Sequence, residues 1–123
     1  MSVKQKILIV EDEKPLAKAL SLKLTKSGFE VVEVHDGQEA LDQINTTKFD
    51  LILTDLVMPK VDGFHFLVEY KNLGLNTPII VLSNLGQNED IKKAKELGAF
   101  DFLIKASTPL SKIVELVNSK LRP

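Results

Sequence analysis

Cysteine is absent from the 123 residues of this sequence. Its absence excludes disulfide bonds, thiol nucleophiles and metal sites built on cysteine. It also fits a reducing cytoplasm, so we expect a cytoplasmic protein. Long apolar runs are lacking too. None approaches the roughly 18 residues of a membrane span, and the first residues have neither the apolar core nor the cleavage site of a signal peptide. We therefore expect no association with membranes.

An excess of charge of either sign is also missing. The chain has 16 Lys and Arg against 17 Asp and Glu, a formal net charge of −1, and no basic run. Such a sequence lacks the basic patch of nucleic-acid-binding domains, so we expect no direct binding to nucleic acid. With 44% hydrophobic and 27% charged residues, its composition is that of a globular protein. The length predicts a single domain over residues 1–123.

Short apolar runs recur along the chain and predict strands. Continuous aliphatic runs at residues 7–10, 51–53 and 79–82 are typical of strands covered on both faces, as in parallel sheets. Residues 100–104, with two phenylalanines, predict a further strand. The valines of residues 31–34 are interrupted by a glutamate, which predicts a less buried strand at an edge.

Amphipathic stretches between these runs predict helices. Their apolar positions are Leu16, Leu20 and Leu24; Ala40, Leu41 and Ile44; Phe64, Leu67 and Val68; Ile91, Ala94 and Leu97; and Leu110, Ile113, Val114, Val117 and Leu121. Pro15 suits the first turn of the first helix, and the second helix should begin near Asp36. Gly28 and Gly98 are expected as left-handed stops, and Asn88 as an N-terminal cap.

Strands and helices therefore alternate five times along the chain. This order predicts an α/β fold, a parallel sheet with right-handed crossovers and with helices on both faces, which is a three-layer αβα sandwich. The order of the strands does not follow from the pattern alone. In open sheets of this kind, ligands bind beyond the carboxyl ends of the strands.

Polar residues stand where the predicted strands end. Glu11 and Asp12 follow the first strand, Asp55 the third, Ser83 the fourth and Lys105 the fifth. Taken singly, each is explained as a turn residue, a helix-terminal acid or a solvated surface group. Because the carboxyl ends of parallel strands meet at one edge of the sheet, the joint pattern predicts a functional site there.

Three carboxylates brought together would repel one another and raise at least one pKa unless a cation intervened. Oxygen ligands without His or Cys fit Mg²⁺ or Mn²⁺ and not zinc. Lys105 suits a phosphoryl oxygen, and Ser83 can donate a hydrogen bond to another. An aspartate nucleophile, a divalent ion and a lysine predict phosphoryl transfer to a carboxylate, with Asp55 as the acceptor.

The set formed by Glu11-Asp12, Asp55 with Met58-Pro59 and Gly63, Ser83, and Lys105 resembles the receiver domain of bacterial response regulators. The resemblance covers essentially the whole chain. It implies a flavodoxin-like, CheY-like sheet of strand order 2-1-3-4-5. It also implies that Asp55 takes a phosphoryl group from a histidine kinase or phosphotransfer protein. We therefore expect a signalling domain that catalyses only its own phosphorylation and dephosphorylation, not a metabolic enzyme.

The same resemblance assigns ligands to the metal ion. Asp12 and Asp55 would bind Mg²⁺ directly, the backbone carbonyl of Val57 would be a third ligand, and Glu11 would act through water. It does not identify the kinase or the downstream protein. It leaves open whether the protein forms a homodimer on phosphorylation. No residue of the sequence supports such a dimer.

A switch is implied as well. Phe102, three residues before Lys105, matches the family's buried-or-exposed aromatic residue, and a core phenylalanine on the last strand is a compatible interpretation. Ser83 and Lys105 would contact the phosphoryl oxygens. Phosphorylation would draw Ser83 toward Asp55 and favour the inward rotamer of Phe102. The face formed by the fourth helix, the fifth strand and the fifth helix would then change for partner binding.

Two positions depart from the usual family pattern. Ala106 stands where a proline reached through a cis bond is usual, and because a non-proline cis bond costs about 3 kcal/mol we expect a trans bond. Asn84 stands where a smaller residue is usual, and we expect its bulk to narrow access to Asp55. Val57 and Leu85 occupy positions that tune hydrolysis in the family. Neither can orient a water molecule, so we expect a long-lived acyl phosphate.

Three other classes of protein share parts of the pattern. A haloacid-dehalogenase-like phosphatase needs its nucleophile after the first strand and a second acid two residues later, where Val57 follows Asp55 here. A flavodoxin needs a hydroxyl- and glycine-rich phosphate loop where residues 11–13 are all acidic. The alternative that stays open is a phosphorylation-independent interaction module, a pseudo-receiver, because Ala106 and Asn84 are unusual.

Overall fold

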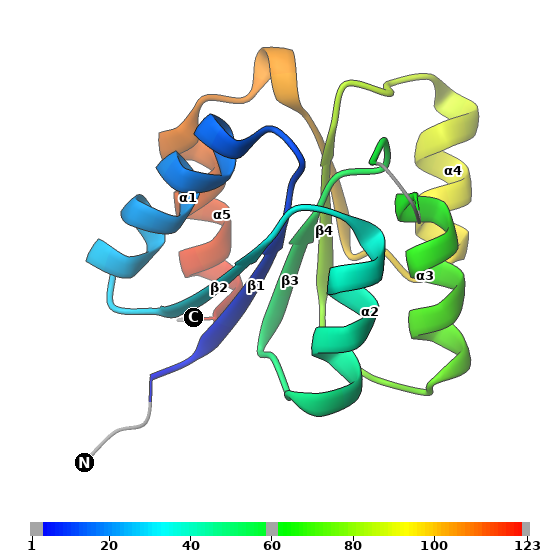
Figure 1. The fold of residues 1–123 in the computed structure, drawn as a ribbon. Helices are drawn as coiled ribbons and strands as arrows, with labels where there is room; N and C mark the ends of the chain where they lie inside the picture. The colour runs from blue at the N-terminus through cyan, green and yellow to red at the C-terminus, as the bar shows by residue number, and fades with distance from the viewer. Residues whose placement is uncertain (1–3, 59–61, 122–123) are drawn as a thin grey trace.

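The computed structural model describes residues 4–58 and 62–121, and within them strands and helices alternate along the chain (Figure 1). The strands are β1 (Lys6–Val10), β2 (Glu30–Val34), β3 (Leu51–Thr54), β4 (Ile79–Ser83) and β5 (Asp101–Ile104). The helices are α1 (Lys14–Lys26), α2 (Gly37–Thr46), α3 (Gly63–Asn72), α4 (Asn88–Glu96) and α5 (Leu110–Leu121), with a short 3₁₀ helix η1 (Lys105–Ser107) before α5. Among these residues no helix is long and apolar enough to cross a membrane.

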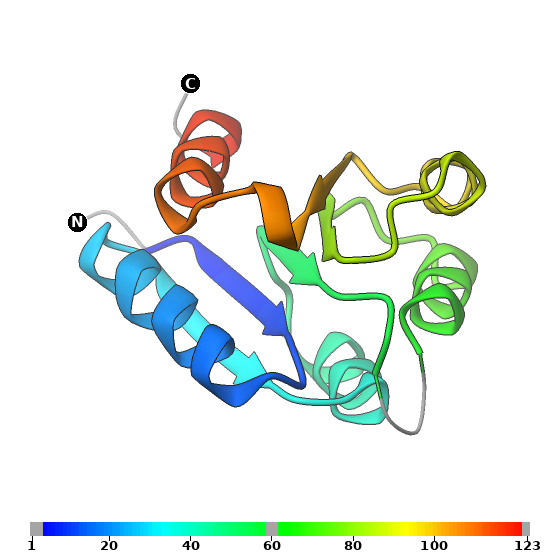
Figure 2. The ribbon, with the colours of Figure 1, turned by 90° about the horizontal axis from the view of Figure 1, so that it is seen from above.

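The five strands form one parallel sheet in the order β2-β1-β3-β4-β5, which confirms the fold expected from the resemblance. Helices α1 and α5 cover one face, and α2, α3 and α4 cover the other (Figure 2). Strand β2 lies at an edge and is only partly buried, as its interrupted valine pattern predicts.

Alternate residues of the central strands face the two helical layers. Ile7 and Ile9 of β1 pack with α1 and α5, whereas Leu8 and Val10 pack with the other helices. All four side chains are at most 1% exposed. Because burying one such side chain stabilises the fold by about 1.5–3 kcal/mol, both faces of β1 favour this register. The continuous aliphatic runs in the sequence follow from this two-sided burial.

Local signals at several helix ends are confirmed. Asp36 caps α2 by accepting a hydrogen bond from the backbone N–H of Glu39 at 2.8 Å. Gly28 and Gly98 have φ of 97° and 105°, the left-handed conformation expected of stops after α1 and α4. The prediction for Asn88 is wrong. It is the first residue of α4, and the cap position is Gln87, whose side chain makes no capping hydrogen bond.

Two apolar assignments also need correction. Val68 is 38% exposed, and α3 buries Phe66 and Tyr70 in its place, since the packing of α3 against the sheet selects the neighbouring stripe of the helix. Phe100 precedes β5 and is 48% exposed, with the ammonium of Lys120 lying 3.9 Å from its ring centre. A cation over an aromatic face stabilises a ring that stays in solvent.

Candidate functional site

The acids at the carboxyl edge of the sheet come together as predicted. Val10 of β1 is in register with Thr54 of β3, so the residues that follow them leave the sheet at the same level. One carboxylate oxygen from each of Glu11, Asp12 and Asp55 lies within 4.8 Å of the others. Glu11 and Asp55 are only 2% and 5% exposed, whereas Asp12 reaches solvent. Two carboxylates are thus held out of water beside a third.

Lys105 extends from η1, after the edge strand β5, over the end of the sheet to these acids. Its ammonium lies 2.7 Å from Asp55 Oδ2, 2.8 Å from Glu11 Oε1 and 2.6 Å from Glu13 Oε2. Its side chain is only 10% exposed. The chain contains no cis peptide bond within the described residues, so Ala106 follows a trans bond as expected, and Lys105 still reaches the site. Glu13 was missed as a member of this cluster, although it directly follows the two predicted acids.

Burial and the close contacts within the cluster shift the pKa values of two of its groups. Burial raises the pKa of Glu11 to about 7, a rise that the nearby Asp55 increases and that contacts with Lys105 and the Glu13 N–H only partly offset. Burial alone would lower the pKa of Lys105, but hydrogen bonds to Asp55, Glu11 and Glu13 outweigh it and raise that pKa. One ammonium therefore faces more carboxylates than it neutralises.

The backbone that follows β3 holds Asp55 in place. Asp55 Oδ1 accepts hydrogen bonds from the N–H groups of Leu56 at 2.6 Å and Val57 at 3.3 Å. Gly63, the first residue of α3, donates its N–H to the Leu56 carbonyl at 2.8 Å. A Cβ at position 63 would stand 2.3 Å from the Asp55 carbonyl oxygen, so only glycine allows this approach. Met58 is buried, and Pro59 lies outside the described residues.

Ser83 stands at the end of β4, next to β3, but its hydroxyl is not exposed toward the acids. The residue is 0% exposed, and its Oγ accepts a hydrogen bond from the Leu85 N–H at 3.2 Å. Within the described part of the chain, no hydrogen bond joins Ser83 to Asp55. The structure thus brings together the acids and Lys105, whereas Ser83 is buried and its hydroxyl contacts the loop after β4.

Three further predicted residues lie around this site. Phe102 is half-buried on β5, packed against the cluster under α3 and α4. Val57 is 58% exposed in the loop after β3. The side chain of Asn84 is exposed, and its Oδ1 accepts a hydrogen bond from the Ala106 N–H at 3.0 Å. That Asn84 narrows access to Asp55 stays a prediction.

The donor set fits a divalent cation of the magnesium type. The three carboxylates offer only oxygen atoms, and their spacing lets one ion touch more than one of them. The carboxylates of Glu11, Asp12, Glu13 and Asp55 lie near the one ammonium of Lys105, so Lys105 alone does not balance their charge. A cation bound here would relieve this excess.

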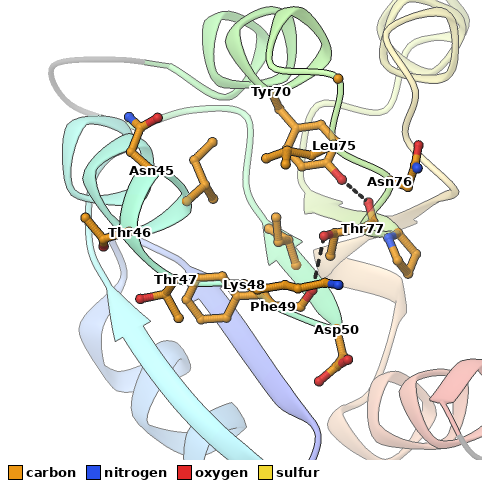
Figure 3. A pocket seen from close by; sticks show the side chains of 14 residues that line it. Asn45, Thr46, Thr47, Lys48, Phe49, Asp50, Tyr70, Leu75, Asn76 and Thr77 are labelled. Atoms are coloured by element: carbon orange, nitrogen blue, oxygen red, sulfur yellow. Dashed lines mark hydrogen bonds between the residues drawn. The ribbon is translucent and has the colours of Figure 1, made fainter.

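A separate cavity of about 680 Å³ lies at the opposite edge of the sheet, between the ends of α2 and α3 (Figure 3). It is lined by residues 44–50 and 74–78 with Ile52 and Tyr70. Its lining includes none of the predicted site residues. The cavity is therefore a second polar region, distinct from the carboxylate cluster.

Comparisons with known proteins identify the family of the chain. The family model described as "Response regulator receiver domain" matches residues 7–118. The alkaline phosphatase synthesis transcriptional regulatory protein PhoP of Bacillus subtilis is 36% identical over 105 residues, which are 85% of this chain and 44% of that protein. The transcriptional regulatory protein DltR of Streptococcus agalactiae is 38% identical over 100 residues, 81% of this chain and 45% of that protein. The chain thus spans less than half the length of these relatives.

Solved structures show the same likeness. The receiver domain of the Francisella response regulator 1452 superposes with a TM-score of 0.89 at 32% identity, covering 95% of this chain and 96% of that one. A two-component response regulator from Clostridium difficile gives a TM-score of 0.90 at 26% identity, with 97% of each chain covered. Because the family model matches residues 7–118, nearly all of the 123 residues, this chain belongs to the response regulator receiver domain family of two-component signalling.

Proposed function

We propose that Asp55 accepts a phosphoryl group from the phosphohistidine of a histidine kinase or phosphotransfer protein. The observation that carries this proposal is the buried Asp55 carboxylate, which lies beside two further acids and 2.7 Å from the Lys105 ammonium. In the transfer, the P–N bond of phosphohistidine breaks with its electron pair left on the imidazole, and an Asp55 oxygen forms the new P–O bond. The chain would catalyse only this transfer and the later hydrolysis of its own acyl phosphate.

The neighbouring residues take distinct roles in this proposal. A bound Mg²⁺ or Mn²⁺ ion would neutralise charge on the phosphoryl oxygens. Asp12, Asp55 and the Val57 carbonyl would bind it directly, and Glu11 through water. Lys105 already points its ammonium at Asp55, so it would contact a phosphoryl oxygen with little rearrangement.

Ser83 and Phe102 form the proposed switch. The Ser83 hydroxyl accepts from the Leu85 N–H and keeps its own proton for donation, so to reach a phosphoryl oxygen Ser83 must move toward Asp55 with its loop. The vacated space would favour an inward rotamer of the half-buried Phe102 and change the face formed by α4, β5 and α5. The two states need to differ by a few kcal/mol in their contacts with the phosphoryl group. An unchanged NMR environment of the Phe102 ring on binding beryllofluoride would exclude this switch.

The acyl phosphate is proposed to be long-lived. Val57 and Leu85 have apolar side chains, and neither can orient an attacking water molecule. Loss of the phosphoryl group within seconds at neutral pH would contradict this. The partner that binds the face formed by α4, β5 and α5 is proposed to be a protein. Because the chain has no basic run and a formal net charge of −1, we propose no direct DNA binding by these residues.

Intact-protein mass after incubation with Mg²⁺ and acetyl phosphate tests the proposal directly. We expect one phosphoryl adduct on the native chain and on Asp42→Asn, an exposed aspartate of α2 that serves as the matched control. We expect no adduct on Asp55→Asn and none after chelation of the metal. An adduct that persists on Asp55→Asn would place the acceptor elsewhere.

The second candidate function is a phosphorylation-independent interaction module. It is favoured by Ser83, which is fully buried and whose hydrogen bond is with the Leu85 N–H and not with Asp55. The absence of an adduct with acetyl phosphate and with a phosphohistidine donor would select this alternative.

A further inference from the structure

A side chain joins the two loops that carry the proposed phosphoryl-contacting residues. The ladder between β4 and β5 ends where Ser83 is in register with Ile104. Beyond it, the Ala106 N–H donates a hydrogen bond to Asn84 Oδ1 at 3.0 Å. Asn84 directly follows Ser83, and Ala106 directly follows Lys105. Lys105 therefore leaves the sheet between the end of the ladder and this hydrogen bond.

Burial does not hold the turn at this point, since Asn84 and Ala106 are both exposed. The other hydrogen bonds of the turn are local. Thr108 Oγ1 donates to the Ile104 carbonyl at 2.7 Å, and the Thr108 N–H to the Lys105 carbonyl at 3.4 Å. Among the described residues, the bond from Ala106 to Asn84 is the hydrogen bond that ties this turn to the loop after β4.

The loop after β4 also lies close to the end of β5. A Cβ added at Gly86 would stand 2.9 Å from Ile104 Cδ1, so the loop after β4 already touches the last residue of β5. This contact fixes the distance between the loops, whereas the directional amide bond fixes how η1 is turned. The orientation of η1 decides where the Lys105 side chain begins its path to Asp55.

We propose that Asn84 is a positioning residue that aims the Lys105 ammonium at Asp55 by holding the Ala106 N–H. The inference rests on the proposed function, because it assigns Asn84 a part in phosphoryl acceptance. It also couples Ser83 to Lys105, since a shift of Ser83 toward Asp55 moves the adjacent Asn84 and, through its amide oxygen, the turn that carries Lys105. An alanine at position 84 has no acceptor for this N–H.

The position of Lys105 can be measured without any ligand. The ¹⁵N NMR signal of a lysine ammonium held by carboxylates exchanges its protons slowly. We expect this exchange to be several-fold faster for Lys105 in Asn84→Ala than in the native chain. Asn76→Ala, an exposed asparagine at the opposite edge of the sheet, is the matched control and should leave the signal unchanged. An unchanged Lys105 signal in Asn84→Ala would overturn the proposal.

Beryllofluoride binding in the presence of Mg²⁺ connects this position to function. Loss of one hydrogen bond should weaken binding by Asn84→Ala about two- to tenfold, while Asn76→Ala binds like the native chain. Equal affinities of the native chain and Asn84→Ala would overturn the proposal. If the native chain bound no beryllofluoride and took no phosphoryl group, the proposed function would fail, and the Lys105 signal would still decide whether Asn84 positions this lysine.

Discussion

Polar groups lie at both ends of the strands, but their hydrogen bonds and charges differ. We call the end with Glu11 and Asp55 the carboxyl edge and the end with the cavity the cavity edge. At the edge lined by the cavity, the Tyr70 hydroxyl donates to the Thr77 carbonyl at 2.6 Å, and the Thr77 hydroxyl donates to the Phe49 carbonyl at 3.1 Å (Figure 3). Both hydroxyl groups are neutral, and both donate hydrogen bonds to backbone carbonyls. At the carboxyl edge, Glu11 and Asp55 are buried side by side with one ammonium between them. At the cavity edge the hydroxyl groups have hydrogen-bond partners. At the carboxyl edge there are more carboxylates than ammonium groups.

This difference indicates what each edge contributes to the protein. Hydroxyl groups that pair with buried carbonyls stabilise the fold and have no further requirement. Buried like charges cost stability unless a cation joins them. Substitutions at the carboxyl edge should therefore change stability in a way that depends on metal and phosphoryl ligands, whereas substitutions at the cavity edge should change stability alone.

Removing the ammonium should have the largest effect. Lys105→Met leaves Asp55 and Glu11 buried without their partner, and breaking such a contact destabilises a protein by about 3–5 kcal/mol. Added Mg²⁺ should restore part of this loss. The check is urea unfolding with and without Mg²⁺, with the exposed Lys112→Met as control. If Lys105→Met lost no more unfolding free energy than Lys112→Met, the carboxyl edge would not hold the unbalanced charge described above.

A methyl group at position 63 should come next. Gly63→Ala forces the loop after Asp55 to move, and overpacking of this kind costs about 1–3 kcal/mol. Because the displaced backbone also holds the Asp55 carboxylate, beryllofluoride affinity should fall with stability. The matched control is Gly74→Ala, for which an added Cβ meets nothing within 4 Å, although its φ of 70° strains any side chain. Full affinity in Gly63→Ala would show that this loop does not place Asp55.

At the cavity edge, Tyr70→Phe should destabilise the fold by about 1 kcal/mol through loss of one hydrogen bond. Chemical unfolding measures this loss. The proposed phosphorylation of Asp55 by acetyl phosphate should be unaffected, because Tyr70 lies at the other end of the strands. A slower phosphorylation in Tyr70→Phe would show that the two edges communicate and would contradict the separation described above.

The smallest effect is a dependence on pH at the same residue. Burial raises the pKa of Tyr70 above its ordinary value of 10.0. The folded state therefore favours the protonated phenol, and this contribution is complete below the unfolded-state pKa and is lost as the pH rises through the folded-state pKa. The native chain should lose stability more steeply than Tyr70→Phe above about pH 10. Parallel stability curves between pH 8 and pH 11 would refute this.

Much of this arrangement could be predicted from the sequence because strands buried on both faces have a strong local signal. The carboxyl edge followed from chain order, which places Glu11, Asp12 and Asp55 at neighbouring strand ends. The order of the strands came from the family resemblance, since hydrophobic pattern carries no information about which strands are neighbours.

The errors have a common physical origin. In α3, the set with Val68 and the set with Phe66 and Tyr70 both have helical spacing, and only packing against the sheet decides between them. The contact of Glu13 with Lys105 and the direction of the Ser83 hydroxyl depend on loop conformation. Such conformations are set by tertiary contacts that a single sequence does not reveal.

Lys105 and Glu11 are 94 positions apart in the chain, and this separation has a consequence for folding. Contacts between residues far apart in the sequence require closure of a long loop, so they form only when most of the chain is folded. The cluster of acids with Lys105 can therefore form only after the last strand has joined the sheet. A nascent chain that stops before residue 105 would carry every acid of the cluster and still lack the lysine that completes it. If the proposed function holds, only a completely folded chain could then be phosphorylated.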